Sequence, residues 1–419
     1  MNGVINIRTS WAASNEPETD FALYLGAVGN PPNPQAKWWG RTPPYSIQFS
    51  ATHKRKLKKL DLVLGGATVQ LRSHNKCEYN DFIRFYYKTR LKINSQLTVG
   101  INGNIMPQHD GMFLIWANTA IYVPFGGDIE LPTSSLRAYD YLWFTLDPHI
   151  TYYDKKGGRH TYHGRIYSTK FVTSVPKLDF YDNAMLNTNE YQYSTKIYEI
   201  CNLVAGSQIN IIGIKTGILL NHKGITSAAY LQTDLDLGKL NISKGIRIEG
   251  FSIDTTSGFT LPVYRIGANL QVNDNTYLRE SAGQGFRVPS ITEMFVFENL
   301  GSLNILLNLG LMPEEVWNFE LGVKKVIKGK KLNVMTDLAL FMSDTRNQTE
   351  FTFGVYSFDY NGQYYNNMLG FRSINLPHSR TAGAELSVNG NVKMRNIPIT
   401  FIGGYTKKVS LLILLIIKI

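Results

Sequence analysis

The sequence lacks any long hydrophobic run, and it has few charged residues for its length. No segment reaches about 18 to 20 consecutive apolar residues, which excludes a transmembrane helix. Charged residues make up 18% of the 419 residues, below the roughly 25% of an average chain. Aromatic residues are abundant instead, with 24 tyrosines and 21 phenylalanines. A mean hydropathy of −0.15 still permits a membrane location, because strands of a membrane barrel alternate apolar and polar residues.

Cysteine and histidine are also scarce, and they give no sign of a metal site. Cys77 and Cys201 are the only cysteines. The two cysteines could form one disulfide in an oxidising compartment, or both could be unpaired thiols. Two unpaired thiols are favoured. His160 and His163 are three positions apart, which places them on opposite faces of a strand. No zinc-ligand spacing and no defensible Ser/His/Asp order appears, so we expect no metal ion, no cofactor and no enzyme.

The formal net charge of +11 raises the question of nucleic-acid binding. The basic residues gather in three short segments, at 53–59, 154–159 and 328–331. No RNA-binding aromatic motif or helix-turn-helix pattern accompanies them. We interpret these segments as solvated turns between strands and expect no nucleic-acid partner.

Apolar and polar residues alternate with period two along many segments. Successive side chains of a strand point to opposite faces, so each such segment has one apolar and one polar face. In a membrane barrel the apolar face contacts lipid and the polar face lines the lumen. The residues expected to face lipid are Tyr264, Leu270, Phe319 and Val323, and those expected to face the lumen are Arg265, Asn269, Glu320 and Lys324.

Connection lengths separate a membrane barrel from a soluble sandwich. Short turns are expected near 54–59, 154–159, 236–239, 272–275, 328–331 and 391–396. Long loops are expected near 29–42, 106–137, 173–188, 251–262, 286–314 and 345–378. Short turns on one rim and long loops on the other are typical of bacterial outer-membrane barrels. The pattern predicts an all-β fold, an antiparallel transmembrane barrel of about 16 to 18 strands.

One block of motifs identifies a family. The segment 278–295 reads LRESAGQGFRVPSITEMF, and 313–322 reads PEEVWNFELG. Together with the R-x-x-G-x-E segment at 380–385, these segments resemble the barrel of TonB-dependent outer-membrane receptors, most closely those of the Bacteroidetes type. The matching residues, which the resemblance assigns a structural role, are Gly283, Gly285, Arg287, Pro289, Glu293, Pro313, Glu314, Glu320, Gly322, Gly383 and Glu385.

The resemblance implies a function in transport. Family members take up a scarce ligand, such as a siderophore, cobalamin or a glycan, across the cell outer membrane. They work with an inner-membrane TonB energy-coupling complex, and outer-membrane lipid surrounds the barrel. Two alternatives from other classes remain, an outer-membrane barrel enzyme and a soluble β-rich binding protein.

The two ends of the chain differ from the family pattern. Residues 1–10 resemble the last strand of the family's N-terminal plug, residues 19–406 the barrel, and residues 407–419 an unrelated apolar tail. Family barrels have about 22 strands. No signal peptide opens the chain. We therefore expect an incomplete barrel that does not by itself support active uptake.

Aromatic residues in the expected long loops are candidates for ligand binding. They are Trp38, Trp39, Trp116 and Tyr364. Aromatic faces at a pore mouth suit siderophores, cobalamin or oligosaccharides. The same residues would also suit an interfacial girdle or packing between loops.

Overall fold

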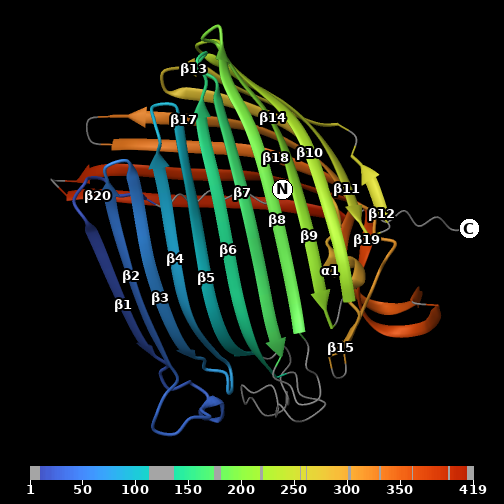
Figure 1. The fold of residues 1–419 in the computed structure, drawn as a ribbon. Helices are drawn as coiled ribbons and strands as arrows, with labels where there is room; N and C mark the ends of the chain where they lie inside the picture. Colours follow the sequence, from blue (N-terminus) through green and yellow to red (C-terminus); the bar gives the residue numbers. More distant parts are fainter. Residues whose placement is uncertain are drawn as a thin grey trace, which may run out of the picture.

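A curved β-sheet forms most of the protein, as seen in the computed structural model (Figure 1). The structure describes residues 10–112, 136–173, 181–217, 220–254, 256–260, 262–300, 303–329, 332–360, 362–394 and 397–412. Within them the sheet has twenty strands, accompanied by one α-helix and one 3-10 turn. No helix in this part of the chain is long and apolar enough to cross a membrane.

The strands follow one another along the chain with short interruptions. The first ten are β1 (Glu18–Ala27), β2 (Tyr45–Leu57), β3 (Leu60–Arg72), β4 (Tyr79–Lys92), β5 (Leu97–Met112), β6 (Arg137–Tyr153), β7 (Arg159–Thr173), β8 (Tyr181–Ile197), β9 (Cys201–Thr216) and β10 (Leu220–Asp236). The others are β11 (Leu240–Ile253), β12 (Thr256–Phe259), β13 (Val263–Asn273), β14 (Thr276–Arg287), β15 (Glu298–Leu300), β16 (Leu303–Leu306), β17 (Glu314–Lys328), β18 (Leu332–Tyr360), β19 (Gln363–Met394) and β20 (Ile397–Leu412). The 3-10 turn η1 spans Pro34–Ala36, and helix α1 spans Ile291–Phe295.

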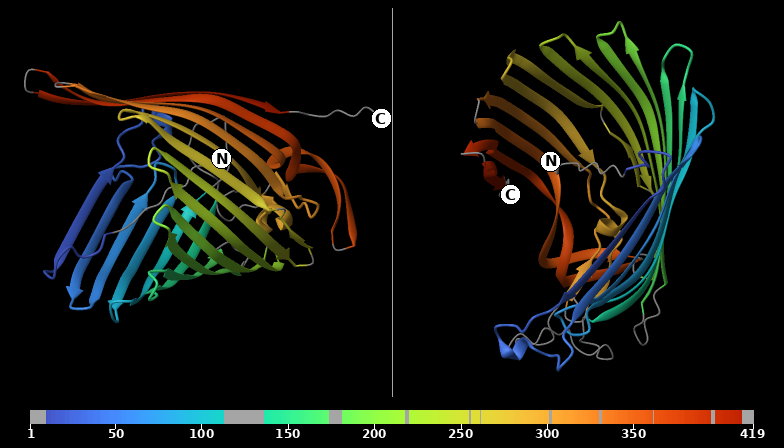
Figure 2. Two further views of the ribbon diagram at one scale, coloured as in Figure 1. Left: turned by 90° about the horizontal axis from the view of Figure 1, so that it is seen from above. Right: turned by 90° about the vertical axis from the view of Figure 1, so that its left-hand side faces the viewer.

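The sheet is an antiparallel meander that curls around a central space (Figure 2). Each long strand pairs with the next long strand in the chain, as β17 does with β18. A parallel contact of β16 with β19 is the exception among the described pairings. Within the described residues β1 pairs only with β2 and β20 only with β19, so both are edges of the sheet. Three strands are short, and the seventeen with ten or more residues agree with the expected number.

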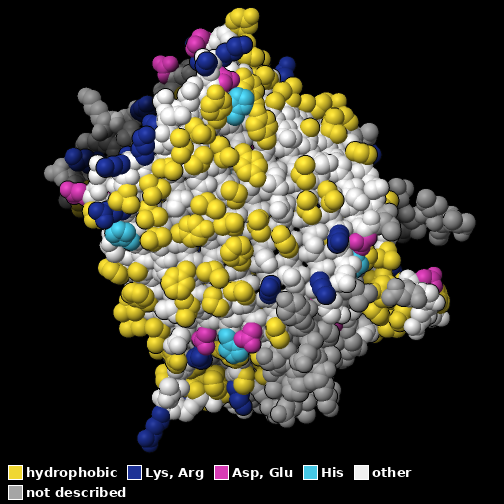
Figure 3. All heavy atoms as spheres, viewed as in Figure 1, with side chains coloured by type: hydrophobic (Ala, Val, Ile, Leu, Met, Phe, Trp, Pro, Cys, Tyr) yellow, Lys and Arg dark blue, Asp and Glu magenta, His cyan; other side chains and the backbone are white. Residues whose placement is uncertain are grey.

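The two faces of the sheet differ in polarity as the sequence predicted. Phe319 and Val323 are each 40% exposed on the convex face. Figure 3 shows the convex face over the first strands of the sheet, where hydrophobic side chains predominate. Glu320 lies on the opposite, concave face, where it accepts a hydrogen bond from Arg279. Other ion pairs on the concave face join Arg90 to Asp61 and Arg165 to Asp147. An apolar outside and a polar inside are the reverse of a soluble fold and are the arrangement of a membrane barrel.

The connections also alternate between two rims. One rim, here called the short-turn rim, carries tight turns such as 58–59, 154–158, 237–239 and 274–275. The opposite, long-loop rim carries the segments 28–44 and 288–313, which contain η1 and α1. Most of the expected loop 106–137 lies outside the described residues.

Four expected loops were predicted too long, among them 106–137, since β5 continues to Met112. The segment 345–378 is almost entirely paired strand. Strands β18 and β19 extend beyond the rim as a hairpin, and their pairing continues to Tyr360 and Gln363. Alternation of Phe351, Phe353 and Val355 with polar residues supports this extension. Strand β8 already begins at Tyr181, and β11 continues to Ile253 before pairing with β12.

The expected boundary of the barrel at residue 406 was also wrong. Strand β20 continues through Lys407 and Lys408 to Leu412, and Ser410 pairs with Thr381 of β19. The apolar run that was interpreted as a separate tail therefore begins inside a strand, because pairing with β19 provides backbone partners that no hydropathy pattern reveals.

Candidate functional site

Helix α1 is held at the long-loop rim by local sequence signals. Pro289 follows the end of β14, and a proline removes the backbone donor that a further strand residue would need. Ser290 then caps the helix, since its Oγ accepts a hydrogen bond from the backbone of Glu293 at 3.2 Å. The Glu293 carboxylate accepts the backbone N–H of Ser290 at 2.7 Å. This reciprocal capping box stabilises the first turn of the short helix that follows Pro289.

A charged cluster joins this helix to the neighbouring strands. Arg287 donates to Glu293 at 2.8 and 3.0 Å and to Glu314 at 2.5 Å. Burial opposes ionisation of Glu293, but the hydrogen bonds from Arg287 and Ser290 outweigh it and hold its pKa below the ordinary value of 4.5. Glu314 also accepts the backbone N–H of Thr349 at 2.7 Å. The cluster therefore links β14, α1, β17 and β18.

Apolar packing fixes the other side of the helix. Ile291 and Met294 are 4% and 3% exposed and form a buried cluster with Ile253 and Leu311. Phe295 stacks on the ring of His222 with centroids 3.8 Å apart. Gly283 and Gly285 thus lie in the strand that leads into a structural anchor at the rim. They do not form a phosphate-binding loop, because the helix that follows, α1, has only five residues.

The remaining motif residues lie along the concave face and the strand ends. Arg279 bridges Glu320 at 2.9 Å and Asp337 at 2.7 Å. Gly322 lies beside this bridge, where a side chain would collide with the Arg279 guanidinium. Glu385 accepts a hydrogen bond from Thr406 at 3.3 Å.

The other glycines and prolines of the motif occupy crowded or terminal positions. Gly383 has no room for a side chain. The carbonyl oxygen of Lys407 and the ring of Phe341 occupy the space that a Cβ atom would need. A Cβ atom at Gly285 would lie 2.7 Å from Val316, and one at Gly283 would lie 3.3 Å from Arg265. The carbonyl oxygen of Pro313 lies 3.5 Å from the Asn347 amide.

Three of the four aromatic residues predicted to bind ligand lie in the described part of the chain, and they do not form one cluster. Trp38 and Trp39 form an edge-to-face pair with centroids 5.7 Å apart. Trp38 donates its indole N–H to the carbonyl oxygen of His74 at 2.7 Å, and Trp39 is only 9% exposed. Trp116 lies outside the described residues. Tyr364 is 62% exposed near the tip of the β18–β19 hairpin. Of the three described candidates, the structure therefore brings together Trp38 and Trp39.

The neighbour of Tyr364 belongs to a second buried cluster. The ring of Tyr365 stacks on Phe358 at 5.1 Å and meets the edge of Phe297 at 5.3 Å. Leu306 and Leu307, at 0% and 1% exposed, form the centre of this cluster. It joins the extended hairpin to the β15–β16 segment, so the hairpin has a small core of its own beyond the barrel wall.

A third aromatic group was missed in the sequence. It lies on the concave face of β6 and β7, close to the long-loop rim, and we call it the aromatic wall. Tyr141 is its centre, with ring centroids 5.6 Å from Tyr139, 5.9 Å from Trp143 and 5.6 Å from Phe171. Tyr167 completes it, 6.1 Å from Trp143. The available signal was the period-two spacing of Tyr139, Tyr141 and Trp143, with Leu142 and Phe144 exposed on the convex face.

Polar atoms without partners adjoin this aromatic wall. The backbone register places Asp110 opposite Tyr139 and Asn80 opposite Asp110. One side-chain oxygen of each, together with the indole N–H of Trp143, is buried without a hydrogen-bond partner among the described residues. Buried polar atoms are normally paired, so such atoms in a concave wall suit a ligand that offers both donors and acceptors.

Neither a metal centre nor a disulfide is present in the described part of the chain. No group of three or more His, Cys, Asp or Glu side chains there is arranged to hold a metal ion. Cys77 and Cys201 are free thiols, the first exposed and the second partly buried. The aromatic wall and the polar atoms beside it provide stacking and hydrogen bonding.

Comparison with solved structures shows the same fold in siderophore and iron receptors. The siderophore receptor PirA from Pseudomonas aeruginosa matches with a TM-score of 0.68 over 95% of this chain at 10% sequence identity. The FrpB iron transporter from Neisseria meningitidis matches with 0.66 over 87% at 10% identity. The alcaligin outer-membrane receptor FauA from Bordetella pertussis matches with 0.61 over 96% at 13% identity.

The chain spans only part of these structures, 73% of PirA, 60% of FrpB and 62% of FauA. No curated protein sequence is significantly similar to it. The family model for the TonB-dependent receptor-like β-barrel matches residues 79–411, which is most of the chain. The antiparallel sheet, its apolar convex face, the rim motif and this match agree, and the chain belongs to the family of TonB-dependent receptor β-barrels of the bacterial outer membrane.

Proposed function

We propose that this barrel belongs to a receptor that takes up a ferric siderophore across the outer membrane. The observation that carries the proposal is the aromatic wall, where the rings of Tyr141 and Trp143 lie 5.9 Å apart on the concave face close to the long-loop rim. Aromatic faces recognise the flat, apolar parts of such ligands. PirA from Pseudomonas aeruginosa, which shares this fold, is a siderophore receptor, and this supports the same class of ligand.

A glycan is the second candidate. Asn80 and Asp110 provide unpaired acceptor oxygens beside the aromatic wall, and sugars offer hydroxyl donors as well as apolar ring faces. A site that hydrogen-bonds hydroxyl groups rejects analogues that lack them. Binding measurements distinguish the two candidates.

The binding test uses the purified 419-residue chain in detergent. Isothermal titration calorimetry with catecholate and hydroxamate ferric siderophores, cyanocobalamin and short oligosaccharides identifies the ligand class. Tyr141→Ala and Trp143→Ala are expected to weaken binding by about tenfold each, since each removes one stacked ring. The control is Phe144→Ala, which removes an aromatic ring from the convex face of the same strand. Equal loss in all three variants, or binding of none of these ligands, would refute the proposal.

Transport by the family is coupled to the TonB complex. We propose that the receptor that contains this barrel also works with this complex. Uptake of labelled ligand by cells is expected to saturate and to stop when a protonophore collapses the proton gradient. The 419 residues alone are predicted to bind ligand without such uptake, because β1 and β20 each have a strand partner on one side only in the described sheet. Protonophore-sensitive uptake by this chain alone would contradict that prediction.

A further inference from the structure

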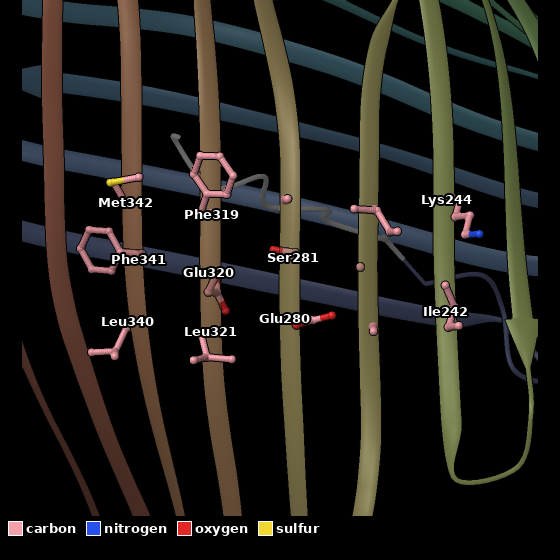
Figure 4. A pocket seen from close by; sticks show the side chains of 14 residues that line it. Ile242, Lys244, Glu280, Ser281, Phe319, Glu320, Leu321, Leu340, Phe341 and Met342 are labelled. Carbon is pink, nitrogen blue, oxygen red and sulfur yellow. The ribbon is translucent and has the colours of Figure 1, made fainter.

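A groove crosses the convex face of the sheet over β11, β13, β14, β17 and β18 (Figure 4). Its volume is about 760 Å³. Two alanines, Ala268 and Ala282, form its floor. Ile266, Phe319 and Met342 form apolar walls beside them. The groove lies on the face that contacts the membrane, so it is separate from the aromatic wall in the lumen.

The backbone register explains why the groove exists. Ala282 of β14 lies opposite Ile266 on one side and Phe319 on the other. One row nearer the short-turn rim, Glu280 lies opposite Ala268 and Leu321. Because neighbouring large side chains stand roughly 5 Å to either side on the same face, each alanine leaves a depression between them.

Two charged side chains line this otherwise apolar groove. Glu280 is exposed on the convex face between Leu278 and Ala282 of its own strand, and Lys244 stands at the β11 side of the groove. Neither has an ion pair or a side-chain hydrogen bond with any other described residue. A lone charge on the lipid face is unfavourable by about 2 to 4 kcal/mol for lysine at mid-membrane and by less near the interface.

The position of the two charges along their strands indicates their depth. Lys244 is four residues beyond Leu240, where β11 begins, and Glu280 is four residues beyond Thr276, where β14 begins. Both strands begin at the short-turn rim. With a rise of about 3.3 Å per residue and a tilt of about 40°, both charges lie roughly 10 Å from that rim along the membrane normal. This depth corresponds to the boundary between lipid headgroups and acyl chains.

We propose that the groove binds a phospholipid with a primary-amine headgroup from the membrane leaflet next to the short-turn rim. Glu280 accepts hydrogen bonds from the ammonium group, and Lys244 faces the phosphate. One acyl chain lies over Ala268 and Ala282, against Phe319 and Met342. A zwitterion complements both charges at once, whereas an anionic headgroup leaves the carboxylate unpaired and a quaternary ammonium offers it no N–H donor. The proposal does not depend on which ligand the receptor transports.

Native mass spectrometry of the purified chain tests this binding. The protein is reconstituted in nanodiscs of equal parts phosphatidylethanolamine, phosphatidylglycerol and phosphatidylcholine and released into a mild detergent. One phosphatidylethanolamine is expected to remain on the wild-type protein. Glu280→Gln, which keeps the side-chain shape, and Ala282→Leu, which fills the floor, are each expected to lower its occupancy by about tenfold, the usual effect of one charge-assisted hydrogen bond or of lost packing.

Two matched variants control for general effects on the convex face. Ala229→Leu enlarges an exposed alanine on β10 that does not line the groove, and Asp140→Asn removes a carboxylate at the opposite rim. Both are expected to retain the lipid like the wild type. Equal retention of all three lipids, or unchanged retention in Glu280→Gln and Ala282→Leu, would overturn the proposal. A wild-type dimer that becomes a monomer in Ala282→Leu would also overturn it, since a second copy of the chain would then occupy the groove.

Discussion

Arg287 and Glu293 are six residues apart and face each other across the turn into α1, with one guanidinium nitrogen 3.0 and 2.8 Å from the two carboxylate oxygens. The same guanidinium reaches Glu314 at the start of β17. One arginine therefore ties a five-residue helix to two strands. A helix this short has little stability of its own and depends on such contacts.

Replacing Arg287 with alanine is expected to loosen α1. The variant leaves Glu293 and Glu314 without their shared partner, and since all three groups are partly exposed we expect a loss of about 1 to 2 kcal/mol. Hydrogen exchange of residues 288–300 measures the effect. Arg165→Ala, which breaks a comparable pair with Asp147 away from α1, serves as the control. Equal exchange at α1 in both variants would contradict the anchoring role.

The same cluster predicts a dependence of stability on pH. The pKa of Glu293 is lower in the folded protein than its ordinary value of 4.5, because the bonds from Arg287 and Ser290 outweigh burial. A depressed carboxylate pKa stabilises the fold above the unfolded pKa, and this contribution is lost as the pH falls through the folded pKa. The melting temperature of wild type should therefore exceed that of Glu293→Gln at pH 7, and the difference should shrink below about pH 4. A difference that stays constant down to pH 3 would argue against this carboxylate as its source.

Gly383 is expected to tolerate no side chain. A methyl group there would meet the carbonyl oxygen of Lys407, so Gly383→Ala should force β19 and β20 apart and cost about 1 to 3 kcal/mol. Gly403→Ala on β20 is the matched control, since open space surrounds that position. Heat-modified mobility in SDS gels reports on sheet integrity. Identical unfolding temperatures for the two variants would show that the strands adjust freely.

Tyr364 and Tyr365 are adjacent but are expected to behave differently. Tyr365→Ala removes a ring from the cluster with Phe297 and Phe358, and it should expose the β18–β19 hairpin to limited proteolysis. Tyr364→Ala should leave proteolysis unchanged, because that ring is mostly exposed. If Tyr364 binds ligand, as the sequence predicts, its variant instead weakens binding in the calorimetric assay. Unchanged affinity would remove Tyr364 from the binding residues.

The two rims are expected to lie on opposite sides of the outer membrane. Trypsin added to intact cells should cleave after Lys37 or Arg41 in the long-loop rim. Lys155 and Lys156, in a short turn, should be cut only after the membrane is opened. Mass spectrometry of the released peptides identifies the cuts. Cleavage at Lys155 in sealed cells would reverse the topology and would move the proposed lipid groove to the other leaflet.

The sequence alone determined the type of fold and the faces of its strands. Alternation in 317–324 assigned Phe319 and Glu320 to opposite faces, because the side-chain period of a strand is two whatever its partners are. The short helix after Pro289 also depends on local residues, since the capping box of Ser290 and Glu293 lies within one turn. Local geometry fixes both features.

Tertiary structure decided which residues meet. Lys407–Leu412 became strand through pairing with β19, and 345–378 became a hairpin because Tyr365, Phe358 and Phe297 share a core. The aromatic wall depends on the register of β6 with β7, and the groove at Glu280 depends on alanines from two strands. Register is set by contacts between distant segments, so the alternating pattern identified each strand but not the neighbours of its side chains.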